Sequence, residues 1–178
     1  LEACNREVAM VRNHVGICDV STLGKIDIVG PDAAAFLDFV YCNTFSTRKE
    51  NRVRYGLMLR EDGHVMDDGT TARLGANHYV MTTTTAAAGQ VMKHLDWVSQ
   101  ALRPDLDARV ASVTEQWAQF AVAGPKARDL LNSILDTPID DENWPFMSCG
   151  SIDIAGVQGR LFRISFSGEH AYEIAVPS

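Results

Sequence analysis

A strand-like segment that runs through Gly-Pro into a helix occurs twice in this sequence, and this repeat restricts the possible folds most. Residues 25–29 alternate in polarity like a strand, a Gly-Pro pair follows, and apolar residues then recur at helical spacing. The same order returns 94 residues later, after the strand-like residues 119–123. Proline sets φ for the first helical turn and glycine permits the sharp turn before it, so the repeat predicts two related halves with helices packed on sheets. The two copies comprise Gly30-Pro31 with Ala33, Phe36, Leu37 and Val40, and Gly124-Pro125 with Ala127, Leu130, Leu131 and Ile134.

The remaining segments predict hairpins and one long helix. A helix is expected over residues 86–102, with Thr85 as its N-cap and Pro104 as its stop. Because hairpins prevail and no series of βαβ units occurs, we predict an α+β fold with mixed, mainly antiparallel sheets and packed helices. The region spans residues 1–178, with possible subdomains formed by 1–48 with 106–178 and by 49–105. The other predicted strands are 55–59, 70–74, 79–83, 150–154, 159–165 and 171–176.

Charge and composition exclude several classes of protein. The 178 residues carry a net charge of −7 and no cluster of Lys and Arg, which argues against a nucleic-acid partner. No uninterrupted apolar run is long enough to span a membrane, and the N-terminal residues do not resemble a signal peptide. The four cysteines form no CxxC pair and are therefore expected to be reduced thiols rather than zinc ligands or disulfides. We expect a cytoplasmic protein.

The common catalytic signatures are absent. The sequence contains no GxGxxG after a strand, no P-loop, no HExxH and no GxSxG. Its five histidines are scattered, so no metal site is predicted.

Asp67-Asp68 follows the predicted turn at Asp62-Gly63, where the chain enters a strand. Adjacent strand residues point to opposite faces, so one carboxylate should face solvent and the other the interior or a cleft. One interpretation is a solvated turn. The other is a carboxylate in a partly apolar pocket that accepts a proton or stabilises a developing cation.

Glu173 lies within a strand in which Tyr172, Ile174 and Val176 share one face. It therefore shares the opposite face with Ala171 and Ala175, whose small side chains leave space for a ligand. Such a carboxylate suits two parallel N–H donors of a planar heterocycle. An exposed strand glutamate is the alternative.

Four motifs resemble the glycine-cleavage T-protein (aminomethyltransferase) family, in the family's order and over nearly the whole chain. They are Arg12-x3-Gly16-x2-Asp19-x-Ser21-x2-Gly24-Lys25-x4-Gly30-x2-Ala33-x3-Leu37, Tyr55-x3-Leu59-x3-Gly63-x3-Asp67-Asp68, Ala121-Val-x-Gly-Pro-x-Ala127 and Ser167-Gly168-Glu169-x2-Tyr172-Glu173-Ile174. This resemblance implies a tetrahydrofolate-binding fold whose C-terminal barrel lies outside these residues.

The resemblance also implies roles for individual residues. It places the family's catalytic aspartate on Asp68, its pterin-binding glutamate on Glu173 and an accessory folate-contact tyrosine on Tyr55. Thr83 stands where the family has a folate-contact asparagine, and Ala171 replaces the glycine of the usual Gly-Tyr-Glu.

Within the family, Met81–Thr85 and Gln116–Phe120 resemble most the folate-binding region of the alpha subunits of heterotetrameric sarcosine oxidases. This resemblance implies capture of a one-carbon unit from sarcosine as 5,10-methylenetetrahydrofolate, other oxidase subunits as partners, and flavin and NAD bound elsewhere in the complex. A glycine-cleavage aminomethyltransferase and a non-catalytic folate-binding regulator remain alternatives.

Overall fold

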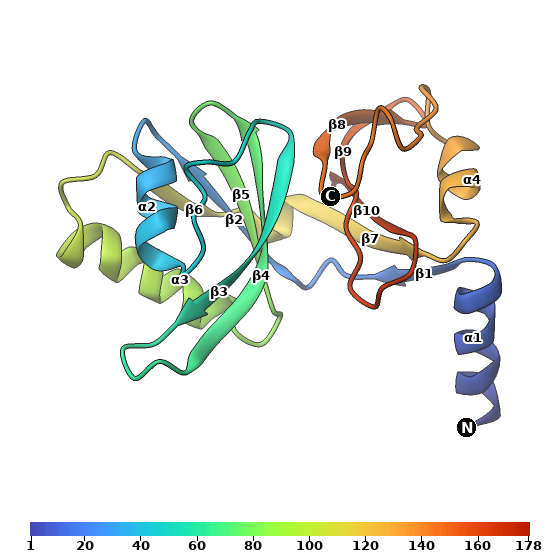
Figure 1. Ribbon diagram of the computed structural model, residues 1–178, viewed down its shortest axis with the longest axis horizontal. Coiled ribbons are helices and arrows are strands. Elements are labelled where there is room, and N and C mark those ends of the chain that lie inside the picture. The colour runs from blue at the N-terminus through green and yellow to red at the C-terminus, as the bar shows by residue number, and fades with distance from the viewer. The chain divides into compact units, whose positions relative to one another are not determined.

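The computed structural model describes all 178 residues and contains helices packed on two five-stranded sheets (Figure 1). The chain divides into two compact units, Thr22–Thr114 and Leu1–Ser21 with Glu115–Ser178. Every strand pairing is antiparallel, which confirms the predicted α+β class. No helix combines the length and the apolar character needed to cross a membrane.

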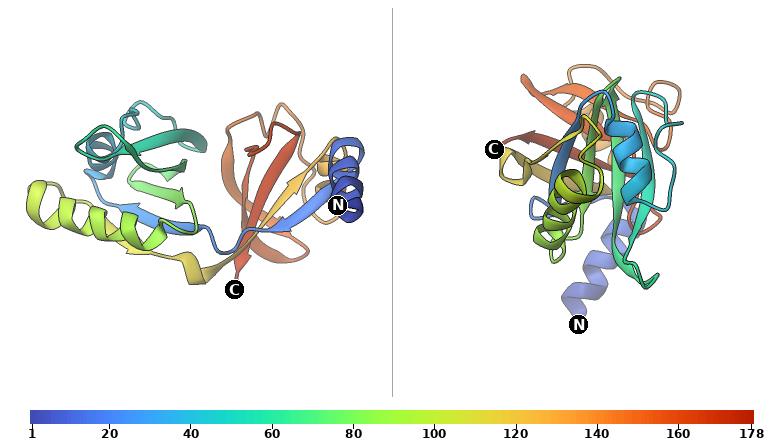
Figure 2. Two further views of the ribbon diagram at one scale, coloured as in Figure 1. Left: turned by 90° about the horizontal axis from the view of Figure 1, so that it is seen from below. Right: turned by 90° about the vertical axis from the view of Figure 1, so that its left-hand side faces the viewer.

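The unit of residues 22–114 is a sheet covered on one face by two helices (Figures 1 and 2). Its elements are β2 (Gly24–Val29), α2 (Ala33–Val40), β3 (Arg52–Leu59), β4 (Val65–Gly75), β5 (His78–Thr83), α3 (Ala88–Trp97), the π-helical turn η1 (Val98–Leu102) and β6 (Arg109–Ser112). The strand order is β3-β4-β5-β2-β6.

The core of this unit follows the predicted helical spacing. All four apolar residues of α2 that the spacing selected are buried, and Phe36 and Leu37 are completely so. They pack with Ile26, Ile28 and Met81 of the sheet in one hydrophobic cluster, so burial of this stripe stabilises the helix against the sheet.

The start of α3 differs from the prediction. Thr84, not Thr85, accepts a hydrogen bond from the Ala87 backbone N–H at 3.3 Å. Thr85 instead contacts the Thr22 hydroxyl at 3.1 Å. That bond lies in the turn before the helix: α3 begins at Ala88 and no side chain caps it, so the predicted cap at Thr85 is wrong.

The second unit contains the N-terminal and C-terminal segments. Its elements are α1 (Glu2–Asn13), β1 (Gly16–Asp19), β7 (Trp117–Ala123), α4 (Ala127–Asn132), β8 (Cys149–Ile154), β9 (Val157–Phe162) and β10 (Ala171–Pro177), and the short turn η2 (Thr114–Gln116) lies at its boundary. The strand order is β1-β7-β10-β9-β8. Its core includes Val122, Leu131, Leu161 and Tyr172, whereas α1 buries no residue.

The two units repeat one topology, which confirms the predicted relation between the halves. In each unit the strand before Gly-Pro is second in its sheet, counted from β6 or from β1. Gly30 and Gly124 have φ values of 144° and 127°, and the carbonyl of each accepts a bond from the first helical residue, at 3.1 Å and 3.0 Å. Glycine is needed because L side chains rarely adopt such φ values.

The predicted subdomain boundaries are wrong. Residues 22–48 and 106–114 belong with 49–105, because β2 pairs with both β5 and β6. One edge strand of each sheet pairs outside its own half of the repeat: β1 precedes β2 in the chain but pairs with β7, and β6 precedes β7 but pairs with β2. The Gly-Pro repeat carried no information about this exchange of edge strands.

We expect Gly124→Ala to destabilise the protein by about 3 kcal/mol, since it combines an unfavourable φ with a backbone clash. A Cβ at this position would lie 2.4 Å from the His14 carbonyl oxygen and 2.6 Å from that of Val11. Gly168→Ala is the matched control, because its φ is also positive (89°) but a Cβ there meets nothing within 4 Å. It should cost about 1 kcal/mol. Equal losses in urea denaturation would contradict the clash.

Candidate functional site

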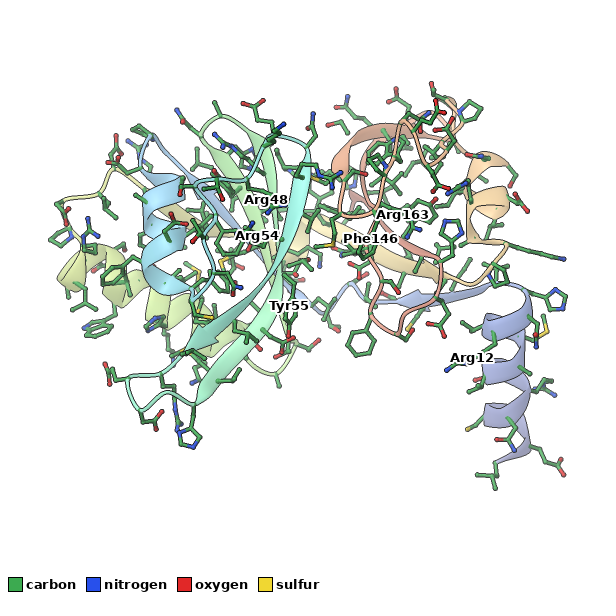
Figure 3. All side chains as sticks on the ribbon, viewed as in Figure 1. Arg12, Arg48, Arg54, Tyr55, Phe146 and Arg163 are labelled. Carbon is green, nitrogen blue, oxygen red and sulfur yellow. The ribbon has the colours of Figure 1, made fainter.

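Tyr55 of β3 and Asp68 of β4 form a hydrogen-bonded pair on one face of the sheet. The Tyr55 hydroxyl donates to Asp68 Oδ2 at 2.9 Å. Tyr55 lies opposite Thr70, and Asp68 lies opposite Leu57, so the strand register places both polar side chains on the same face. Tyr55, which Figure 3 labels, is half exposed, and Asp68 is partly exposed, so the pair remains accessible.

The Asp68 carboxylate changes the acidity of its partner. Accepting the phenolic hydrogen bond raises the pKa of Tyr55 above its ordinary value of 10.0, and burial and the negative charges of Asp68 and Asp67 act in the same direction. Below this raised pKa, the Tyr55 hydroxyl remains protonated and donates a hydrogen bond to the Asp68 carboxylate. The carboxylate is thereby held in one orientation over the whole neutral range.

Asp68→Asn is expected to lower the pKa of Tyr55 toward 10, because an amide oxygen stabilises the protonated phenol less than a carboxylate does. Ultraviolet difference absorbance during alkaline titration measures this change, and subtracting the curve of Tyr55→Phe isolates the Tyr55 transition. An unchanged midpoint in Asp68→Asn would mean that the two side chains do not interact in solution.

Asp67 has a different environment, as strand alternation predicted. It is 7% exposed and points to the face of β4 that the helices cover. Its oxygens accept the backbone N–H of Thr84 at 3.0 Å and the Thr84 hydroxyl at 2.8 Å. The two aspartates therefore lie within a strand, one inside and one outside, and the solvated turn is excluded.

Thr83 does not share the face of the Tyr55–Asp68 pair. It is 3% exposed, its hydroxyl donates to the Thr84 carbonyl at 2.9 Å, and it lies beside Gly24 on the helix-covered face. Thr82 lies on the face of Tyr55 and Asp68, and its hydroxyl accepts the Thr70 backbone N–H at 3.0 Å. The register between β4 and β5, which pairs Thr71 with Met81 and Ala72 with Val80, is what selects Thr82 rather than Thr83.

Glu173 belongs to β10 in the other unit. As predicted, Tyr172 and Ile174 face the hydrophobic core, and Glu173 shares the opposite face with Ala171 and Ala175. Gln119, which the sequence did not single out, is 2% exposed and donates from Nε2 to Glu173 Oε2 at 2.5 Å. This bond holds one carboxylate oxygen in place among alanine side chains.

A cationic cluster on the other face of β10 fixes the strand that carries Glu173. The Tyr172 hydroxyl contacts Arg128 Nε at 3.0 Å and His170 Nε2 at 3.2 Å. Arg163 stacks over the Tyr172 ring at 4.8 Å and over the Phe146 ring at 5.6 Å (Figure 3). Burial is the main cause that lowers the pKa of His170 below 6.5, and the positive charges of Arg163 and Arg128 lower it further. The imidazole is therefore neutral at neutral pH.

The structure thus brings Tyr55 and Asp68 together, places Thr83 on the opposite face of the same sheet and holds Glu173 in the second unit.

No group of three or more His, Cys, Asp or Glu side chains is arranged to bind a metal ion. An accessible carboxylate with a fixed phenol partner can orient an amine or stabilise a positive charge.

Comparison with known proteins identifies the family to which this chain belongs. The model of the GCVT N-terminal domain matches residues 1–178. The alpha subunit of sarcosine oxidase from Rhizobium meliloti (strain 1021) is 56% identical over 99% of this chain, which covers 18% of that subunit. An aminomethyltransferase from Staphylococcus haemolyticus is 32% identical over 92% of this chain, which covers 44% of that enzyme.

A solved structure agrees with the fold. The glycine cleavage system aminomethyltransferase T from Bartonella henselae superposes with a TM-score of 0.82 at 23% identity, over 97% of this chain and 44% of that one. The chain spans about a fifth of its sarcosine oxidase relative and less than half of the aminomethyltransferases. Since the family model matches residues 1–178, the whole of this chain, the chain belongs to the GCVT N-terminal domain family.

Proposed function

We propose that this chain is the tetrahydrofolate-binding region of a sarcosine oxidase alpha subunit and captures the one-carbon unit of oxidised sarcosine as 5,10-methylenetetrahydrofolate. The observation that carries the chemistry is the accessible Asp68 carboxylate, held by the Tyr55 hydroxyl at 2.9 Å. The 56% identity to an alpha subunit of sarcosine oxidase, over nearly the whole chain, supports the choice of oxidase.

The residues present fit a reduced folate. A pterin ring offers a ring N–H and an exocyclic amine side by side, and a carboxylate can accept both in parallel. Glu173 supplies that carboxylate; it is half-buried in β10, and its buried neighbours Ala171 and Ala175 carry no polar side-chain group that competes for it. Gln119 already donates a hydrogen bond to Oε2 of this carboxylate, so it limits the directions from which the ring can bind.

Tetrahydrofolate supplies two amine nitrogens that bond the incoming carbon, while the amino group of the released glycine takes up their two protons. Asp68 would orient the reacting amine and stabilise the positive charge that develops as the carbon is transferred. Tyr55 would keep the Asp68 carboxylate turned toward that amine, because its hydroxyl donates to one oxygen and leaves the other available. Holding the two reactants together contributes much of the remaining acceleration.

The oxidation itself requires other parts of the protein. We propose that flavin and NAD bind outside these residues, that further oxidase subunits are the partners, and that the complex is cytoplasmic. Neither a nucleic acid nor a membrane is proposed as a partner, since the chain is acidic.

An aminomethyltransferase of the glycine cleavage system is the second candidate, because such an enzyme is 32% identical over most of this chain. The two candidates differ in the carbon donor. An oxidase subunit takes the carbon from sarcosine, whereas an aminomethyltransferase takes it from an aminomethyl group on a lipoyl carrier protein.

The deciding experiment supplies each donor to the full-length protein, assembled with its partner subunits, in the presence of tetrahydrofolate. We expect 5,10-methylenetetrahydrofolate from sarcosine and none from the aminomethyl-lipoyl carrier. Calorimetric titration with folinic acid tests folate binding in parallel. Saturable binding without product from either donor would favour a non-catalytic regulator and overturn the proposal, and so would the absence of binding.

A further inference from the structure

A second carboxylate, that of Asp67, lies next to Asp68 and takes no part in the proposed chemistry. It is 7% exposed and therefore largely removed from water. Burial of a carboxylate is costly unless hydrogen bonds compensate for the lost hydration. Both Asp67 oxygens accept a hydrogen bond from Thr84. The Thr84 backbone N–H donates to Oδ2 at 3.0 Å, and the Thr84 hydroxyl donates to Oδ1 at 2.8 Å.

Thr84 connects this carboxylate to the first turn before α3. Its hydroxyl oxygen accepts the Ala87 backbone N–H at 3.3 Å and donates its own hydrogen to Asp67 Oδ1. Each bond in such a chain polarises the next and strengthens it. Asp67 thus ties the middle of β4 to the segment that leaves β5.

The backbone beside Asp67 is restrained on its other side as well. The Thr82 carbonyl approaches Gly69 so closely that a Cβ at that glycine would lie 2.1 Å from the oxygen. The next residue, Thr70, donates its backbone N–H to the Thr82 hydroxyl at 3.0 Å. Asp68 is therefore held between two points at which β4 is attached to residues 82–84.

From these contacts we infer that Asp67 is a positioning residue: through Thr84 it fixes the β4 backbone so that the Asp68 carboxylate faces the Tyr55 hydroxyl. Since adjacent strand residues point to opposite faces, a rotation that releases Asp67 from Thr84 also turns Asp68 away from Tyr55. This inference rests on the proposed function for its catalytic consequence, but its geometric part concerns only Asp67, Asp68, Tyr55 and Thr84.

The test replaces Thr84, which is exposed, so its substitution leaves the packing of the hydrophobic core unchanged. Thr84→Val removes the hydroxyl and keeps the size of the side chain, whereas Thr84→Ser keeps the hydroxyl. In the full-length protein with its partner subunits, we expect Thr84→Val to lower kcat for 5,10-methylenetetrahydrofolate formation roughly 10-fold, the loss expected for one hydrogen bond to a charged group. The KM for tetrahydrofolate should change less than about 2-fold, and Thr84→Ser should retain the wild-type kcat.

The alkaline titration of Tyr55 supplies a readout that does not depend on turnover. If Asp68 turns away in Thr84→Val, the pKa of Tyr55 falls toward 10, and Thr84→Ser restores it. An unchanged Tyr55 titration and an unchanged kcat in Thr84→Val would overturn the inference, as would equal losses in both variants. If the wild-type protein forms no methylenetetrahydrofolate, the proposed function fails, while the Tyr55 titration still decides whether Asp67 positions Asp68.

Discussion

Asp68→Asn in the full-length protein is expected to lower the rate of 5,10-methylenetetrahydrofolate formation roughly 100-fold, the usual effect of removing one group that stabilises charge in a transition state. Asparagine has the size of aspartate and still accepts the Tyr55 hydrogen bond, so the packing around β4 changes little. It lacks the negative charge that stabilises a developing cation. The rate of product formation at saturating tetrahydrofolate measures the effect.

The matched control is Asp62→Asn, which removes a carboxylate from the exposed turn of the same β3–β4 hairpin. Both variants lose one negative charge, but only Asp68 is paired with Tyr55. Asp62→Asn should retain the wild-type rate. In Asp68→Asn the affinity for folinic acid should change only a few-fold, because the substitution acts on the transfer step and not on folate binding. A wild-type rate in Asp68→Asn would rule out Asp68 as the catalytic carboxylate.

Local patterns in the sequence predicted the elements whose burial is regular. The helical stripe of α2 is buried as the spacing of Phe36 and Leu37 required. Strand alternation separated Asp67 from Asp68 and placed Glu173 opposite the core. These features depend only on residues close together in the chain, where the side-chain period fixes the face.

Features that depend on pairing across the chain were missed. β1 and β6 are four residues long and mostly exposed, so they carry no alternation that identifies a strand. Their partners lie far away in the sequence, as for Ile17 and Val122. Gln119 escaped notice for the same reason, since only the β7–β10 register brings it to Glu173, and the choice between Thr82 and Thr83 also required the register of β5.

Glu173→Gln is expected to weaken the binding of folinic acid to the full-length protein roughly 10- to 100-fold, since hydrogen bonds to a charged group contribute about 1.5–3 kcal/mol. A carboxylate accepts two N–H groups in parallel, whereas an amide offers one oxygen and presents an N–H₂ group to the second donor. The buried Gln119 amide adds to the loss, because its Nε2 donates to the Glu173 carboxylate in the native protein. Calorimetric titration measures the change in Kd.

Glu142→Gln, in the exposed loop before β8 of the same unit, is the matched control and should bind folinic acid with the wild-type Kd. The comparison separates the loss of one particular acceptor from a general reduction of negative charge. The flanking alanines make the outcome decisive: the side chains of Ala171 and Ala175 carry no polar group that could replace the carboxylate as a partner for the pterin N–H groups. A Kd within about 3-fold of wild type in Glu173→Gln would therefore mean that the pterin ring is not bound at this position of β10.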